Sequence, residues 1–364
     1  MTRKGGALSS RPALVTGGAG FIGANLVDHL ASQGTEVVIY DNLSRASVEQ
    51  NLAWLKERHG ERITFVRGDV RDAQLLAKTA AGVGRVFHFA AQVAVTTSLD
   101  APLEDFEVNA RGTLNLLEAL RSLPSPPPLV YTSTNKVYGA LPEVALLEEE
   151  ARWSPADVEL AAHGVSEKRP LDFHSPYGCS KGTADSYVLD YARSFGLPAV
   201  VFRMSCIYGP RQFGSEDQGW VAHFFRRALA GQPITIYGDG KQVRDLLFIG
   251  DLVAALSLAH DRIDELAGRA FNIGGGADHT LSLHELLDRI EHLLGRRPEV
   301  TFEGWRTGDQ RYYVSDTRAF QTATGWRPRV TLDEGLARLA GWLAKLAGAP
   351  AFDSALFGAE AMRF

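Results

Sequence analysis

The sequence predicts an α/β fold: a doubly wound parallel sheet with helices on both faces, and a smaller mixed α/β lobe toward the C-terminus. Short β-branched runs alternate with amphipathic stretches through the first two hundred residues. Strands that alternate with helices form a parallel sheet covered on both faces. After Cys206 the strands shorten, as in ITIYGDG, and a helical pattern follows in LSLHELLDRIEHLLG.

The strands of the predicted sheet are short apolar runs. The stretches between them, such as FIGANLVDHLASQG, carry apolar residues at helical spacing. A later run at 270–274 is expected to return to the sheet, whereas 141–175 is expected to form an acidic, irregular insertion. The strands before it are expected at 13–17, 35–41, 63–69, 86–91, 128–134 and 198–204.

The composition argues against several classes of protein. The 364 residues are 45% hydrophobic, which is enough for a large core. The net charge is -5 without a basic run, so neither nucleic acid nor an anionic membrane is an expected partner. Two cysteines argue against a disulfide framework or a zinc site. Since no apolar stretch suits a signal peptide or a membrane span, we expect a cytoplasmic protein. No metal ion is expected.

The segment VTGGAGFIGANL predicts a dinucleotide-binding loop. Gly17, Gly20 and Gly23 follow the first strand and open a helix. Small residues are needed there because the turn is tight, the backbone approaches a pyrophosphate, and the helix packs on the strand. The N-terminus of the helix then binds the negative phosphates.

Acidic residues at strand ends predict contacts to the rest of the dinucleotide. Asp41 ends the second strand at roughly the distance of ~20 residues expected for a ribose ligand. Its charge would repel a 2′-phosphate, which favours NAD over NADP, although Arg45 lies nearby. Asp69 ends the third strand and could bond the adenine region, or could simply form a turn.

The segment HSPYGCSKG places a tyrosine and a lysine one helical turn apart. Ser175 and Pro176 are typical of an N-cap and the residue after it, so a helix begins there. Tyr177 and Lys181 then share a face, an arrangement that also occurs by chance on many helices. We expect the helix dipole, the ammonium and a nicotinamide cation to lower the pKa of Tyr177, so that its phenolate can accept a sugar proton.

Thr134 is a candidate third member of this group. The segment TSTNKVYG lies at the C-terminal end of the fifth strand, where ligands bind in such sheets. The hydroxyl of Thr134 could hold the reacting oxygen beside Tyr177. Without these neighbours it would be an ordinary strand threonine.

The glycine loop, Asp41, the TST-x-x-VYG segment and Tyr177-x-x-x-Lys181 together resemble the extended short-chain dehydrogenase/reductase family of nucleotide-sugar enzymes, over roughly residues 11–345. The resemblance implies a Thr134, Tyr177 and Lys181 triad and a tightly held NAD. It also implies a Rossmann-type domain at 11–205 and 242–276 and a nucleotide-sugar lobe at 206–241 and 277–348. The tails at 1–10 and 349–364 are expected to be weakly anchored.

The resemblance also indicates which residues contact the cofactor and how the protein assembles. A homodimer or homotetramer is implied, through helices that include the one at Pro176. Besides Tyr177 and Lys181, the cofactor contacts expected are Gly17, Gly20, Phe21, Ile22, Gly23, Asp41, Asn42, Arg45, Asp69, Val70, Ala90, Gln92 and Asn109.

The residues that follow Thr134 bear on the reaction. Sugar 4,6-dehydratases of this family carry acidic residues there, in patterns like STDEVYG, whereas this chain has Asn135 and Lys136. Neither side chain is a carboxylic acid, so dehydration is disfavoured. The stretches STNKVYG, LDFHSPYGCSKG and GKQVRD are similar to epimerases that act at C2 of CDP-hexoses.

The same resemblance implies the substrate contacts. Asn135 and Lys136 would orient sugar hydroxyls, and Gln218 would line the sugar or base pocket. Arg244 and Arg311 would hold the diphosphate, which suits their planar donor forks, although each could be a surface arginine. Cys206 stands where the wider family has an asparagine, so the pocket is expected to differ from that of 4-epimerases.

The expected reaction is epimerisation at C2 of a CDP-hexose, by transient oxidation to a 2-keto sugar and return of the hydride. One rival mechanism oxidises C3 and moves the C2 proton with a separate base, for which His174 is nearest in sequence. A rival enzyme is a UDP-sugar 4-epimerase with the same triad. A regulator that only senses NAD would be expected to have a degraded triad, and here the triad is intact.

Overall fold

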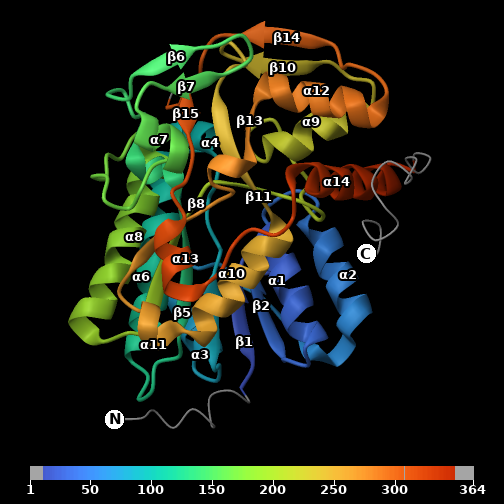
Figure 1. Cartoon of the computed structure of the whole chain (residues 1–364). Coiled ribbons are helices and arrows are strands. Elements are labelled where there is room, and N and C mark those ends of the chain that lie inside the picture. The colour runs from blue at the N-terminus through green and yellow to red at the C-terminus, as the bar shows by residue number, and fades with distance from the viewer. Residues whose placement is uncertain (1–10, 307, 349–364) are drawn as a thin grey trace. The chain divides into compact units, whose positions relative to one another are not determined.

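The computed structural model describes residues 11–306 and 308–348, which form two units (Figure 1). The first unit comprises residues 11–137, 175–203 and 253–271. The second comprises the remaining described residues. The tails at 1–10 and 349–364, expected to be weakly anchored, lie outside the described residues.

The boundaries differ from those expected of the two domains. Residues 138–174, 204–205, 242–252 and 272–276 were expected with the nucleotide-binding domain, and they belong instead to the second unit. The physical reason is strand pairing. Strand β11 (Val243–Phe248) pairs with β9, β13 and β15, which belong to the second unit.

A seven-stranded sheet forms the centre of the first unit. Its strand order is β12-β8-β5-β4-β1-β2-β3. Strand β1 pairs in parallel with β2 and β4, and β2 with β3 and β4 with β5 are also parallel pairs. These seven strands are the seven predicted from the sequence. They are β1 (Ala13–Thr16), β2 (Val37–Asp41), β3 (Ile63–Arg67), β4 (Arg85–His88), β5 (Leu129–Thr134), β8 (Ala199–Met204) and β12 (Ala270–Ile273).

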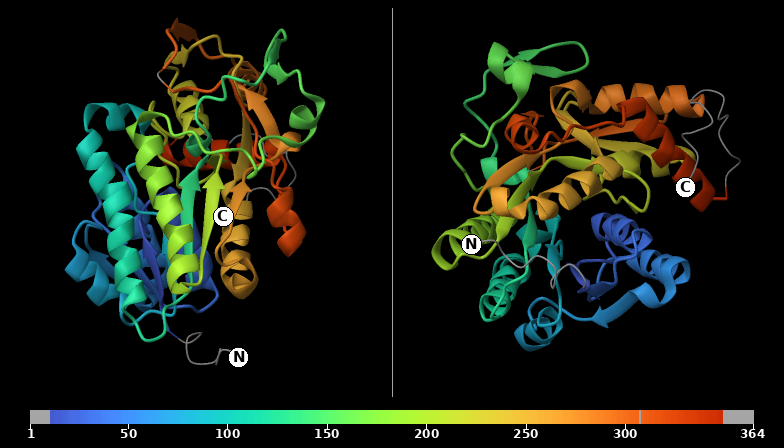
Figure 2. Two further views of the ribbon diagram at one scale, coloured as in Figure 1. Left: turned by 90° about the vertical axis from the view of Figure 1, so that its left-hand side faces the viewer. Right: turned by 60° about the horizontal axis from the view of Figure 1, so that its bottom comes forward.

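Helices cover both faces of this sheet (Figure 2). One face is covered by α3 (Ala73–Ala80), α6 (Gly112–Arg121) and α8 (Ser175–Phe195), whose buried Leu76, Leu116 and Val188 join the apolar core. The other face carries α1 and α2. The bounds of the remaining helices are α1 (Phe21–Ser32), α2 (Val48–His59), α4 (Val95–Asp100), α5 (Pro102–Phe106), α10 (Ile249–Asp261) and α11 (Ile263–Leu266).

The second unit is a smaller mixed α/β structure, as predicted. Strand β11 pairs in parallel with β9 and β15 and antiparallel with β13, and β10 pairs with β14. Its strands are β9 (Cys206–Tyr208), β10 (Ile234–Tyr237), β13 (Thr280–Ser282), β14 (Val300–Glu303) and β15 (Tyr312–Tyr313). Its helices are α7 (Val158–His163), α9 (Trp220–Leu229), α12 (Leu283–Leu294), α13 (Arg318–Thr324) and α14 (Leu332–Leu346).

The expected irregular insertion is in part regular. Strands β6 (Leu146–Glu148) and β7 (Trp153–Pro155) form an antiparallel hairpin, and α7 follows with Asp157 as its N-cap. The strands contain three residues each, which is too short for an alternating pattern to be recognised.

A buried ion pair fixes α8 to the central sheet. Arg203 on β8 donates from Nε and Nη2 to the two carboxylate oxygens of Asp185 on α8, both at 2.9 Å. Both side chains are buried. A bidentate pair of this kind sets the position of the helix along the strand.

We predict that Asp185→Asn destabilises the chain by about 3 kcal/mol, because it leaves the Arg203 guanidinium buried without its counter-charge. Urea unfolding measures the change. The control is Asp190→Asn on the same helix, which removes the exposed partner of Arg193 and is expected to leave the unfolding midpoint unchanged. Equal midpoints for all three proteins would contradict this role of the ion pair.

Candidate active site

The glycine loop between β1 and α1 has the close contacts that a dinucleotide needs. Gly17 has a φ of +69°, and a Cβ there would lie 2.7 Å from the Ala90 nitrogen. A Cβ on Gly23 would overlap the Gly17 carbonyl oxygen. Gly20 caps α1, whose first residues are Phe21 and Ile22. A loop this tight, which leads directly into the N-terminus of α1, suits a pyrophosphate, so these residues fit NAD.

Asp41 lies at the C-terminal end of β2, beside the glycine loop. Its carboxylate accepts hydrogen bonds from the Ala19 nitrogen at 3.0 Å and the Leu43 nitrogen at 2.8 Å. Burial raises the pKa of Asp41, and the two backbone donors oppose that rise. These bonds hold the carboxylate where a ribose ligand is expected.

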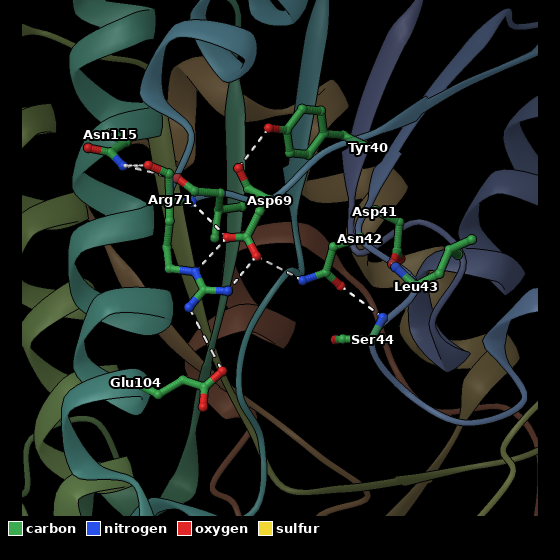
Figure 3. Close-up of polar contacts among 10 residues, drawn as sticks. Tyr40, Asp41, Asn42, Leu43, Ser44, Asp69, Arg71, Glu104 and Asn115 are labelled. Carbon is green, nitrogen blue, oxygen red and sulfur yellow. Dashed lines mark hydrogen bonds and ion pairs between the residues drawn. The ribbon is translucent and has the colours of Figure 1, made fainter.

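Asp69 follows β3 and is the centre of a polar cluster (Figure 3). Arg71 donates to both of its carboxylate oxygens, from Nε at 2.9 Å and Nη2 at 2.8 Å, and Asn42 donates from Nδ2 at 3.0 Å. These hydrogen bonds hold the pKa of Asp69 well below its usual range. The structure therefore brings together the expected cofactor residues Asn42 and Asp69, and it adds Arg71, which the sequence reasoning missed.

Tyr177 and Thr134 meet at the end of the central sheet. Ser175 begins α8, and its hydroxyl oxygen accepts a hydrogen bond from the Gly178 nitrogen at 3.3 Å, as predicted for an N-cap. This places Tyr177 in the first turn, where it is buried and its phenol hydrogen-bonds with the Thr134 hydroxyl. Thr134 also contacts Asn135 Oδ1 at 3.3 Å.

The expectation of a lowered pKa for Tyr177 is wrong when only the groups of the chain itself act on the phenol, without a bound cofactor. Burial raises the pKa of the phenol to about 12, and the negative charge of Asp105 adds to the rise. The Thr134 hydrogen bond and the Arg45 guanidinium act in the opposite direction but are weaker. The helix position alone therefore does not make Tyr177 a phenolate.

Lys181 lies one turn further along α8 but is directed to the sheet. Its ammonium donates to the Thr132 carbonyl oxygen at 2.7 Å and lies 4.5 Å from the centre of the Tyr131 ring. Burial lowers the pKa of Lys181 to about 7, although Asp185 and Asp105 act to raise it. Tyr177 and Lys181 are therefore both buried, and the backbone of β5 holds the lysine side chain.

A buried network supports the first turns of α8 and was missed from the sequence. Ser180 hydrogen-bonds with Asp105, and Asn109 donates to Asp105 Oδ1 at 3.2 Å and to Ser180 Oγ at 3.0 Å. Asn109 also accepts from the Gln92 nitrogen at 2.9 Å. The spacing of Asp105 and Asn109, one helical turn apart, was the available signal.

Asn109 belongs to a π-helical turn, η2 (Glu107–Arg111), between α5 and α6. Such turns are frequent at functional sites because they redirect a side chain within a helix. Among the other expected cofactor residues, Ala90 lies against Gly17, and Val70 is buried against Gly112 at the start of α6.

The expected substrate residues Asn135 and Lys136 lie directly after β5 in the first unit. Asn135 is buried, and the Lys136 nitrogen donates to Thr134 Oγ1 at 3.2 Å. No carboxylic acid follows Thr134, so the position at which dehydratases of the family carry an acid has only an amide and an amine.

The second unit contains the other expected substrate residues. Cys206 accepts a hydrogen bond from Trp220 Nε1 at 3.4 Å, and Gln218 closes a tight turn with Ser215. The buried Arg244 donates to Asp309 Oδ1 at 2.6 Å. Arg311 is exposed.

His174, the base of the rival mechanism, also belongs to the second unit. Its Nε2 lies 2.9 Å from Asp172 Oδ2, and both side chains are partly exposed to solvent. This contact accounts for the orientation of its ring.

Lys181 makes a testable contribution to the pH dependence of folding. Between its lowered pKa of about 7 and its usual value of ~10.4, the unfolded chain binds more protons than the folded chain. The free energy of unfolding therefore rises with pH in this window. We expect urea unfolding to report a smaller rise from pH 7 to about pH 9.5 in Lys181→Met.

The control for this prediction is Lys78→Met, which alters an exposed lysine of α3. Its pH dependence should match that of the unaltered chain. Equal slopes for all three proteins would contradict the lowered pKa of Lys181.

Comparison with known proteins identifies the family to which these site residues belong. Residues 13–274 match the NAD dependent epimerase/dehydratase family. The chain is 43% identical over 340 residues to the CDP-paratose 2-epimerase of Salmonella typhi, covering 92% of this chain and 99% of the relative. It is 35% identical over 327 residues to the UDP-glucose 4-epimerase of Mycolicibacterium smegmatis, covering 89% and 96%.

The fold comparison gives the same result. The chain is similar to the crystal structure of the Thermus thermophilus UDP-glucose 4-epimerase in complex with NAD, with a TM-score of 0.76 and 33% identity over 91% of this chain and 98% of that one. The expected fold, cofactor and family resemblance are thereby confirmed. The chain belongs to the NAD dependent epimerase/dehydratase family.

Proposed function

We propose that this enzyme inverts the configuration at C2 of a CDP-hexose. The observation that carries the proposal is the contact between the Tyr177 phenol and the Thr134 hydroxyl, followed by Asn135 and Lys136 in place of an acid. This set can remove and return a hydroxyl proton but has no acid beside Thr134 to protonate a leaving group. The name of the Salmonella typhi relative, a CDP-paratose 2-epimerase, supports both the carbon and the nucleotide.

The proposed roles of the triad follow from its contacts. Bound NAD supplies a hydride acceptor and a positive charge on its nicotinamide ring. Tyr177 takes the proton of the 2-hydroxyl when the sugar is oxidised and returns it when the sugar is reduced. Thr134 hydrogen-bonds the reacting oxygen. Lys181 holds the nicotinamide ribose and influences the protonation of Tyr177 by its charge.

The phenol must lose its proton before it can accept one from the sugar. Because burial raises the pKa of Tyr177, positive charge nearby is needed to lower it. Arg45 already acts in that direction within the chain. In the proposed site, the phenolate therefore forms only when cationic groups surround it.

The remaining site residues hold the two nucleotides. We assign Gly17, Gly20, Gly23, Asp41 and Asn109 to NAD, together with the other expected cofactor residues. Arg244 and Arg311 bind the substrate diphosphate, since planar guanidinium forks suit paired phosphate oxygens. Asn135, Lys136, Gln218 and Cys206 contact the sugar or the base.

The alternative is a UDP-sugar 4-epimerase that applies the same triad to another carbon. It is supported by the relative from Mycolicibacterium smegmatis, at lower identity. Cys206 favours the first proposal, because the wider family has an asparagine there.

The location and assembly are also proposals. No described helix is long and apolar enough to cross a membrane. We propose a cytoplasmic location, which agrees with the low cysteine content of the sequence. We further propose a homodimer or homotetramer.

A substrate panel tests the proposed function. The enzyme with NAD is incubated with CDP-hexoses and UDP-hexoses, and the products are followed by NMR. We expect inversion at C2 of a CDP-hexose, because the triad then acts on the 2-hydroxyl. Inversion at C4 of a UDP-hexose, without any change in the CDP-hexoses, would support the alternative instead.

Turnover in heavy water tests the route of the hydrogen. Hydride return keeps the original hydrogen at C2, so we expect no deuterium there in the product. Deuterium at C2 would contradict hydride return and would support oxidation at C3 with a separate base. His174→Gln serves as the companion variant and is expected to retain turnover.

A further inference from the structure

The β6–β7 hairpin is fastened to the turn between β10 and β11. The Trp153 nitrogen donates to the Lys241 carbonyl oxygen at 2.9 Å, and Lys241 Nζ donates to Glu148 Oε1 at 2.8 Å. Arg152 donates to Glu285 Oε2 at 3.0 Å. Figure 1 shows the hairpin beside β15. The insertion is therefore held in a defined position within the second unit.

The same turn fixes two indole rings. Trp153 donates from Nε1 to Asp239 Oδ2 at 2.9 Å. Trp305 packs so closely on Gly238 that a Cβ there would lie 2.8 Å from its ring, and Gly238 has a φ of +89°. Only a glycine suits both the contact and the backbone conformation at this position.

Arg311 contacts both of these rings. Its guanidinium carbon lies 5.0 Å from the centre of the Trp153 ring and 5.4 Å from that of Trp305. Over the described part of the chain, no carboxylate forms an ion pair with Arg311. Arg244 on the neighbouring strand β11 differs, because it is buried and bonded to Asp309.

This difference leaves Arg311 suited to an anion. A guanidinium held over aromatic rings keeps its in-plane N–H donors available, and its charge is not neutralised by a carboxylate. A long side chain that is already held in place also loses less conformational freedom when it binds a ligand. The two tryptophans therefore position Arg311 to bind a doubly charged group such as a diphosphate.

We infer that Trp153 is a positioning residue for the substrate. Together with Trp305 it orients the Arg311 guanidinium toward the diphosphate of the nucleotide sugar, so the β6–β7 hairpin contributes to substrate affinity. The inference rests on the proposed function, which assigns Arg311 to the diphosphate.

The test compares Trp153→Leu, Trp153→Phe and Arg311→Met in the NAD-loaded enzyme. Calorimetry measures the affinity for CDP, and steady-state kinetics with the CDP-hexose that is turned over give kcat and KM. The matched control is Trp54→Leu, which removes a tryptophan that contacts Arg58 at 5.9 Å in the first unit. Thermal unfolding shows that each variant folds.

We expect Trp153→Leu to weaken CDP binding and raise KM by about tenfold, with kcat nearly unchanged. Trp153→Phe should restore most of the loss because it keeps an aromatic face, and Trp54→Leu should have no effect. If Trp153→Leu binds CDP normally while Arg311→Met does not, the inference is overturned and the proposed function stands.

Two further outcomes count against the inference in different ways. If Arg311→Met itself binds CDP normally, the assignment of Arg311 within the proposed function is wrong, and the inference falls with it. If Trp153→Leu lowers kcat and thermal stability and Trp153→Phe does not restore them, Trp153 has only a structural role.

Discussion

The charged and polar side chains that α8 buries against the central sheet are paired with partners on the sheet and the neighbouring helices. Asp185 pairs with Arg203, Lys181 bonds the Thr132 carbonyl oxygen, and Ser180 bonds Asp105. An unpaired buried charge would be severely destabilising, so these contacts fix both the rotation and the position of the helix. The position of the Tyr177 phenol beside Thr134 is a consequence of this pairing.

The same burial determines the chemistry of the site. It raises the pKa of Tyr177 and lowers that of Lys181, so both side chains tend toward their neutral forms. A neutral tyrosine is a poor base, and the proposed site needs cationic groups to change that. We therefore propose that the chain alone does not form the catalytic base, and that electrostatic interactions link cofactor binding to proton transfer.

Much of the fold was predictable because the sheet is built from apolar runs between helical patterns. The glycine loop was predictable for a similar reason, since a close backbone contact such as that of Gly23 with Gly17 excludes any side chain. The hairpin at β6 and β7 was not predictable, because strands of three residues leave no alternating pattern.

The electrostatics of the site were the least predictable part. The sequence places Lys181 one turn from Tyr177, but it does not reveal that the ammonium is directed to Thr132, or that Asp105 lies close enough to oppose a phenolate. These effects depend on residues from separate helices and strands. Likewise, only the packing of the second unit brings Trp153 and Trp305 to Arg311.

The most direct test of the central claim is Tyr177→Phe, which removes one hydroxyl group and leaves the ring in place. NAD binding by calorimetry and epimerisation by NMR are measured on the same sample, with Tyr187→Phe on the exposed side of α8 as control. Our account predicts normal NAD binding, no detectable epimerisation in Tyr177→Phe, and full activity in the control. Undiminished epimerisation by Tyr177→Phe would contradict it.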